Sequence, residues 1–363
     1  MKKTLIHKKL KKLKKIRLPK KGHKKHSTPS RITNETVAEH RERVISEGRR
    51  YKYPLQYARH KLVFNTLIIS VAAIILLAIV GWWQLYIIQN TNTFFYRVAQ
   101  VAALPVGTVD GQQVRYSDYM LYYRPSEHFL RNYDEVDLDS RDGKLQLEYV
   151  KRDAMNRAIA DAQARRIASE QNLTVTSEEV DRATEVLKSA DNGTLSNDEV
   201  RTSTEQVLGM TEDDIRTQYY NSLLRGKAAF SVDDTAREQS ELVKRRVDDG
   251  QSLQDIAESL NREQANTVEY NRSGMVSRAV LFNGVFVSEI AAGERNKIIG
   301  PLKSTSADGY LFTKVVSSDD ARVNFEYLFI PLRAFTAQIE QLREDGKVNE
   351  FITIDIEKYA AEE

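Results

Sequence analysis

The chain has 363 residues, of which 41% are hydrophobic and 29% charged, so it holds enough apolar material for two or three domains. It contains no cysteine, which excludes disulfides, a thiolate nucleophile and a cysteine-ligated zinc site. The net charge of +3 conceals an asymmetry, since residues 1–61 carry 21 of the 54 Lys and Arg residues but 4 of the 51 Asp and Glu residues.

Residues 1–61 include the low-complexity run KKLKKIRLPKKGHKK, which has little apolar material to bury. We predict that this basic tail is largely disordered and cytoplasmic. We also expect it to contact anionic lipid headgroups, because each Lys or Arg near such a surface contributes about 1 kcal/mol. Basic arms also bind nucleic acid, but the apolar segment that follows favours the lipid interpretation.

Residues 62–88 read LVFNTLIISVAAIILLAIVGWWQLYII, without a charged side chain. A helix needs about 20 apolar residues to cross a bilayer, so we predict a single transmembrane helix that ends in an aromatic belt of Trp82, Trp83 and Tyr86. The alternatives are a buried core helix and a cleaved signal peptide, whose apolar region is shorter and nearer the start of the chain. The positive-inside rule places the basic tail in the cytoplasm and the residues after the helix outside.

Residues 97–230 are predicted to form a helical domain that opens with a hairpin. The dipeptide Asp110-Gly111 supplies the positive φ values of a tight turn. From residue 145 onward, apolar residues recur at helical spacing. Three helix starts carry the capping-box pattern, namely Thr176 with Glu179, Ser196 with Glu199, and Thr211 with Asp214.

Residues 231–335 differ in character and predict an α+β module. Two helices separated by Gly250 precede four strand-like segments, NTVEYNR, KIIGPL, YLFTKVV and NFEYLFI. Residues 336–363 are predicted to form a helix and then a strand or helix that return to the helical domain. The fold class of the whole chain is therefore α+β, with one N-terminal transmembrane helix.

The segments PVGTVDGQQVRYSDY, LTVTSEEVDRA and GMTEDDIRTQYYNSLLRGKAAF follow the apolar helix in that order. Over residues 104–230 they resemble the N-terminal chaperone domain of exported folding factors of the SurA, PrsA and PpiD type. The resemblance implies a domain that binds unfolded or newly exported polypeptides.

The next module is similar to a parvulin peptidyl-prolyl isomerase domain over residues 232–316. The similarity is carried by RRVDDGQSLQDIAESL, VFVSEIAAGERNKIIGPLKS and DGYLFTKV. Parvulins have two histidines that face each other in the active site, one in the first strand and one after the Gly-Tyr pair of the last strand. Here Leu311 stands at the second position, and no histidine follows His128. The resemblance therefore implies a degenerate isomerase module.

Prolyl isomerisation needs an apolar pocket and hydrogen bonds to a twisted amide, but no nucleophile. Four side chains are candidates for a substrate-binding pocket, although their spacing also suits an ordinary core: Met275, Phe282, Phe286 and Tyr310. No catalytic residue is assigned. The strand-like stretch VNFEYLFIP, residues 323–331, comes after the closing strand, and we hypothesise that it fills the vacant first-strand position by pairing with residues 310–316.

Residues 137–148 approach a calcium loop, with Asp137, Asp139 and Glu148 at the first, third and last positions. Arg141 occupies the fifth position, however, and the glycine comes one place late. We interpret the stretch as a solvated acidic turn and expect neither a metal nor a cofactor.

These features together predict a single-pass protein of the cell membrane, with a cytoplasmic N-terminus and an extracytoplasmic part that acts as a chaperone. An active isomerase with an altered pocket is one alternative, and a non-catalytic envelope scaffold is another.

Overall fold

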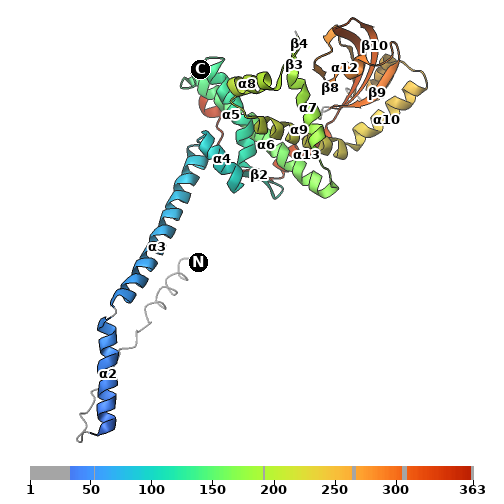
Figure 1. The fold of residues 1–363 in the computed structure, drawn as a ribbon. Coiled ribbons are helices and arrows are strands. Elements are labelled where there is room, and N and C mark those ends of the chain that lie inside the picture. Colours follow the sequence, from blue (N-terminus) through green and yellow to red (C-terminus); the bar gives the residue numbers. More distant parts are fainter. Residues whose placement is uncertain (1–32, 53, 191–192, 264–266, 305–308, 361–363) are drawn as a thin grey trace. The chain divides into compact units, whose positions relative to one another are not determined.

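The computed structural model describes residues 33–52, 54–190, 193–263, 267–304 and 309–360 (Figure 1). It divides into two compact units, Met1–Ala78 and Ile79–Glu363. Helices and strands are mixed along the chain, so the predicted α+β class is confirmed. The first 32 residues of the predicted basic tail lie outside the described residues.

The described part of the basic tail, residues 33–52 and 54–61, is mostly helical, and the rest of the tail lies outside the described residues. Helix α2 spans Asn34–Lys52. Its first turn is fixed locally, because the Thr36 hydroxyl donates a hydrogen bond of 2.8 Å to the Thr33 carbonyl. Farther along, Glu39 precedes Arg43 by four residues, a spacing at which opposite charges stabilise a helix.

The apolar segment forms helix α3, Pro54–Trp82, which continues as a π-helical turn, η2, Trp83–Ile87. The helix starts eight residues before the predicted boundary, at a proline whose missing N–H has no partner in a first turn anyway. The stretch Leu62–Ile87 has a mean hydropathy of 2.8 and is long and apolar enough to cross a membrane.

The second unit begins with the predicted hairpin and a set of helices. Asp110 and Gly111 have φ values of +46° and +80°, as the tight turn requires. All three predicted capping boxes are formed. The elements are α4 (Thr93–Ala102), β1 (Pro105–Val109), β2 (Gln112–Arg115), α5 (Tyr116–Asn132), α6 (Arg141–Gln171), α7 (Ser177–Thr184), η3 (Glu185–Lys188), β3 (Ser189–Ala190), β4 (Gly193–Thr194), α8 (Asn197–Leu208) and α9 (Glu212–Val232).

The first core of this unit is built on α5 and α6, which pack against each other along their lengths. Tyrosine rings of α5 fill this core. The rings of Tyr116 and Tyr119 pack edge to face with their centres 5.7 Å apart, and those of Tyr119 and Tyr123 are stacked with their centres 5.8 Å apart. Small residues of α6, such as Ala158 and Ala162, are fully buried and allow α5 to approach closely.

The four predicted strands are all present and form one antiparallel sheet in the order β5-β11-β10-β9. Helices α10 and α11 pack on one face, where Tyr310 and Phe312 lie, and α12 packs on the other, where Leu311 and Val315 lie. The elements are α10 (Asp234–Asp248), α11 (Leu253–Glu263), β5 (Glu269–Arg272), β6 (Val276–Ser277), β7 (Leu281–Phe282), β8 (Val285–Phe286), α12 (Val287–Ala291), β9 (Ile298–Lys303), β10 (Gly309–Ser318) and β11 (Arg322–Pro331).

Strand β11 pairs with β10 from Gly309 opposite Pro331 to Ser318 opposite Val323. Its other edge pairs with β5. The pairing that the first-strand hypothesis requires is therefore present, and β11 lies inside the sheet rather than at its edge.

The last segment leaves the sheet and packs on the helical part of the same unit. It comprises α13 (Ala334–Glu344), β12 (Val348–Glu350) and α14 (Glu357–Ala360). Strand β12 pairs with β1, and Leu342 and Ile352 are buried in the first core. The chain passes from the helical part to the sheet module near Asp233 and returns near Arg333. The Asp233 carboxylate links these two points, because it accepts hydrogen bonds from Ala236 N at the start of α10 (2.9 Å) and from Arg333 N (2.7 Å).

Candidate functional site

The predicted substrate pocket is divided between the two faces of the sheet. Tyr310 is 4% exposed and packs edge-to-face on Phe230, at 5.0 Å, under α10. Phe282 belongs to the opposite face, where its ring lies 5.0 Å from Phe325 and 4.9 Å from Tyr327. Tyr310 and Phe282 therefore pack on opposite faces of the sheet. The physical reason is the two-residue period of a strand, which points Tyr310 and Leu311 in opposite directions.

The other two predicted residues differ in exposure. Met275 is 44% exposed, and Phe286 is half-buried at the residue that precedes α12. Only Phe282 packs on the same sheet face as Leu311.

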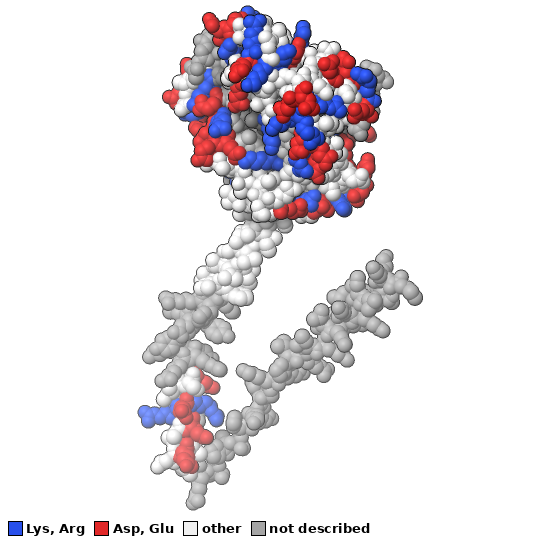
Figure 2. Space-filling model, turned by 90° about the vertical axis from the view of Figure 1, so that its right-hand side faces the viewer, with Lys and Arg blue, Asp and Glu red and all other residues white. Residues whose placement is uncertain are grey.

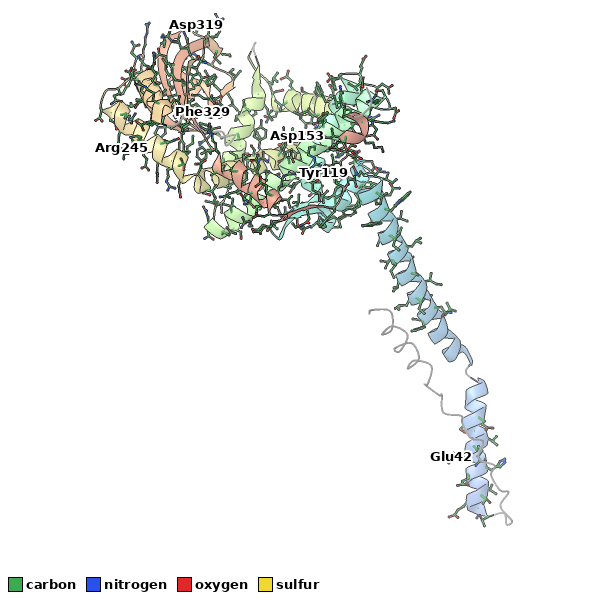
Figure 3. The ribbon with its side chains drawn as sticks, turned by 180° about the vertical axis from the view of Figure 1, so that it is seen from behind. Glu42, Tyr119, Asp153, Arg245, Asp319 and Phe329 are labelled. Atoms are coloured by element: carbon green, nitrogen blue, oxygen red, sulfur yellow. The ribbon has the colours of Figure 1, made fainter. Side chains whose placement is uncertain are left out.

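Leu311 and its cross-strand neighbour form an apolar pair at the centre of the sheet. The register places Phe329 directly opposite Leu311, and the two side chains are 7% and 0% exposed respectively (Figure 3). Thr313, two residues along the same face, is fully buried, and its hydroxyl has no hydrogen-bond partner among the described residues. This face is therefore filled by side chains and offers no titratable group at the Leu311 position.

A site that the sequence did not reveal lies in the helical part, where α5, α6, α9 and the α8–α9 turn enclose an open groove of about 460 Å³. Its apolar lining combines two aromatic rings, aliphatic side chains and a methionine. The lining residues are Tyr122, Pro125, Ser126, Phe129, Leu130, Val150, Asp153, Arg157, Leu208, Met210 and Gln218.

The groove exposes apolar surface at its mouth. Phe129 is 37% exposed and stacks on Tyr133 with the ring centres 5.8 Å apart. Asp153, at the rim (Figure 3), forms an ion pair of 2.9 Å with Arg157, whose guanidinium lies 5.7 Å from the Tyr122 ring. The rim is thus polar and the interior apolar, an arrangement typical of binding grooves.

The wall of the groove is held by a buried polar network. Tyr122 donates a hydrogen bond of 2.7 Å to Asp161, which also accepts from Asn221 at 3.0 Å and pairs with Arg225. Burial, followed by the charge of Asp161, raises the pKa of Tyr122 well above its ordinary value. The phenol therefore stays protonated as a donor, and α5, α6 and α9 are locked together behind the groove.

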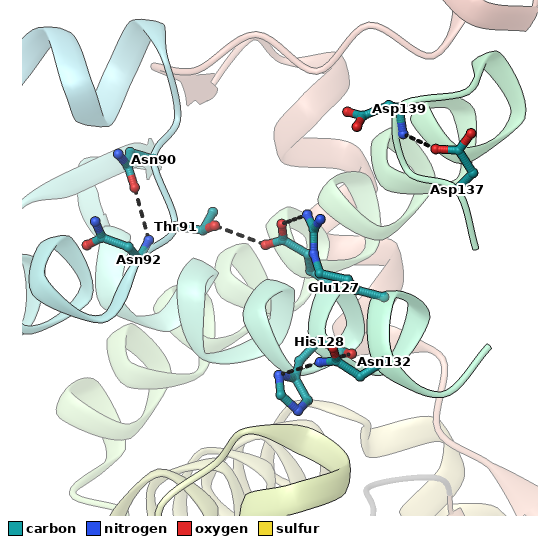
Figure 4. A network of polar contacts seen from close by, with 9 residues as sticks. Asn90, Thr91, Asn92, Glu127, His128, Asn132, Asp137 and Asp139 are labelled. Carbon is teal, nitrogen blue, oxygen red and sulfur yellow. Dashed lines mark hydrogen bonds and ion pairs between the residues drawn. The ribbon is translucent and has the colours of Figure 1, made fainter. Parts of the chain in front are cut away.

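The α8 side of the groove is attached through His128. Its Nε2 lies 2.8 Å from the Gln206 carbonyl oxygen, and its Nδ1 lies 3.0 Å from the side-chain amide nitrogen of Asn132 (Figure 4). Gly209 then turns the chain with a φ of +62°, which carries Leu208 and Met210 into the lining. No side chain of α8 is buried, so this helix is the least anchored part of the groove.

The calcium-like stretch does not form a loop. Ser140 caps α6, so Glu148 lies two turns into that helix, where it accepts from Asp355 N at 2.8 Å and pairs with Lys151 at 2.7 Å. Among the described residues, no group of three or more acidic or histidine side chains is placed to hold a metal ion.

Comparison of the chain with protein-family models, with curated proteins and with solved structures found no match.

Proposed function

We propose that the chain is a membrane-anchored folding factor whose second unit binds unfolded, newly exported polypeptides in the groove between α5, α6 and α9. Residues 62–87 would cross the membrane, with the basic tail in the cytoplasm and the second unit outside. The observation that carries the proposal is an apolar groove of about 460 Å³ that remains open on a rigid helical scaffold.

The chemistry of the lining suits clients of many sequences. Met210 and Phe129 offer polarisable and aromatic surface, and a methionine adapts its shape to different apolar side chains. Contacts of this kind are non-directional, so they give affinity for exposed apolar segments without selecting one sequence.

The sheet module supports a binding or scaffolding role over catalysis. An active parvulin would have two imidazoles that face each other. In this chain Leu311 stands at one of those positions, and the residue opposite it in the paired strand is Phe329. The position of β11 between β10 and β5 is what a strand that replaces the missing first strand would adopt. We propose that the module shapes the second unit and holds client segments, while the groove supplies most of the affinity.

The test uses the full chain in detergent micelles with a fluorescently labelled, permanently unfolded polypeptide. We expect saturable binding, suppression of client aggregation and no acceleration of cis–trans exchange in a proline peptide. Accelerated exchange would instead identify an isomerase. The absence of both client binding and catalysis would leave the envelope scaffold as the better description.

A further inference from the structure

The apolar helix is built into the folded unit at its end. Leu85 is 2% exposed and belongs to the first core, and the Leu85 carbonyl accepts a hydrogen bond of 2.6 Å from the Tyr116 hydroxyl. One residue on, the Tyr86 hydroxyl donates to the Pro105 carbonyl at 2.5 Å. The end of the apolar stretch, at Leu85 and Tyr86, is therefore part of the second unit.

The residues that follow are fixed in the same way. Gln89 donates to the Thr353 carbonyl at 2.8 Å, and Thr91 donates to the carboxylate of Glu127 at 2.9 Å (Figure 4). Asn92 then caps α4 by accepting from Phe95 N at 3.1 Å. The residues between the apolar helix and α4 are therefore held by hydrogen bonds to the rest of the second unit.

Helix α4 has a buried face and an unusually apolar exposed face. Tyr96 and Ala99 are buried in the first core, at 2% and 0% exposure. Phe94 and Val101, seven residues apart and so on one side of the helix, are 68% and 90% exposed. Arg97, three residues after Phe94 and four before Val101, is exposed on the same side.

The charge pattern of this region is equally unusual. Between Lys61 and Asp110 the sequence contains a single charged residue, Arg97. The rest of the second unit is rich in both signs, and Figure 2 shows uncharged surface where the chain enters it. The Arg97 guanidinium donates to Gln100 at 2.8 Å and lies 5.5 Å from the centre of the Tyr96 ring. A guanidinium has five N–H donors, so it can contact an anion as well.

The distance along the chain keeps α4 close to the end of the apolar helix. Five residues separate Ile87 from Thr93, and an extended chain covers at most about 3.6 Å per residue. Helix α4 therefore starts within about 20 Å of the point where a span ending at Ile87 would leave the hydrocarbon. Aromatic and aliphatic residues on one side with a single arginine are typical of helices that lie in the membrane interface.

We propose that α4 lies in the outer interface of the same bilayer, with Phe94 and Val101 at the level of the headgroups and upper acyl chains and Arg97 among the lipid phosphates. The proposal rests on the membrane anchor proposed above and deepens it. The second unit is then held against the membrane in one orientation.

The experiment uses the full chain reconstituted in phosphatidylcholine–phosphatidylglycerol vesicles. Because the natural chain has no cysteine, Val101→Cys and the control Asp320→Cys, an exposed residue in the β10–β11 turn, each provide one labelling site for an environment-sensitive fluorophore. Quenching is measured with lipids that carry a doxyl group near the headgroup or near the end of the acyl chain.

We expect the label at position 101 to shift to the blue and to be quenched severalfold more by the headgroup-proximal doxyl lipid than the label at position 320. Adding Phe94→Asp to Val101→Cys should abolish most of that quenching, while the protein still floats with the vesicles. Equal quenching at positions 101 and 320 in floating protein overturns the α4 proposal and leaves the anchor intact. Protein that does not float with the vesicles overturns both.

Discussion

Replacing Phe129 by Ala tests whether the groove supplies the affinity for unfolded polypeptides. The ring is 37% exposed at the groove mouth. For an aromatic side chain with a total area of about 200 Å², this corresponds to about 75 Å² that a client can cover. At about 25 cal/mol per Å², full coverage of that area is worth about 1.9 kcal/mol, or roughly a 20-fold change in Kd.

The assay is fluorescence anisotropy of a labelled unfolded polypeptide titrated with the full chain. Tyr149→Ala is the matched control, since Tyr149 is an aromatic residue of α6 that is 55% exposed and does not line the groove. We expect Phe129→Ala to raise Kd by up to about 20-fold and Tyr149→Ala to leave it within about twofold. Equal effects of the two substitutions would refute the assignment of binding to the groove.

Three further predictions concern the scaffold. Asp161→Asn should lower the free energy of unfolding by about 3 kcal/mol, because it removes the buried charge that pairs with the partly buried Arg225, and urea denaturation compared with the exposed Asp153→Asn checks this. Burial raises the pKa values of Tyr96, Tyr122 and Tyr123 above their ordinary value of 10, so the stability that these tyrosines contribute should be complete below pH 10 and be lost as the pH rises further. Their phenolate absorbance should then appear together with unfolding, and ionisation near pH 10 in the folded protein would contradict the burial. Gly309→Ala should cost more than about 2 kcal/mol, because a Cβ there would overlap the Ile330 carbonyl of the paired strand, whereas Gly274→Ala, in open space at a φ of +67°, should cost about 1–2 kcal/mol.

Local signals in the sequence were sufficient for many elements of the fold. The Asp110-Gly111 turn and the capping boxes at Thr176, Ser196 and Thr211 depend on residues at most three positions apart, and all four are formed. The strands were predictable because apolar and β-branched residues cluster between turn residues. Helix α2 was not predicted, because Asn34–Lys52 contains little apolar material from which helical periodicity could be recognised.

The candidate sites were harder to predict, for two different reasons. The groove brings together Phe129, Val150 and Met210 from separate elements, and no spacing along the chain connects them. Tyr310 and Leu311 are neighbours in a strand and face opposite sides, but nothing in the sequence says on which side Phe282 packs. Apolar character alone does not say which face of a sheet a residue occupies.

The most direct test of client binding in the groove is site-specific cross-linking in the full chain. Ser126 lines the groove and is close in size to cysteine, so Ser126→Cys can carry a photoreactive group there, with Tyr149→Cys as the exposed control on α6. With an unfolded polypeptide as client, we predict strong cross-linking from position 126 that an excess of unlabelled client abolishes, and weak cross-linking from position 149. Equal yields from both positions, or none from position 126, would contradict the proposed function of the groove.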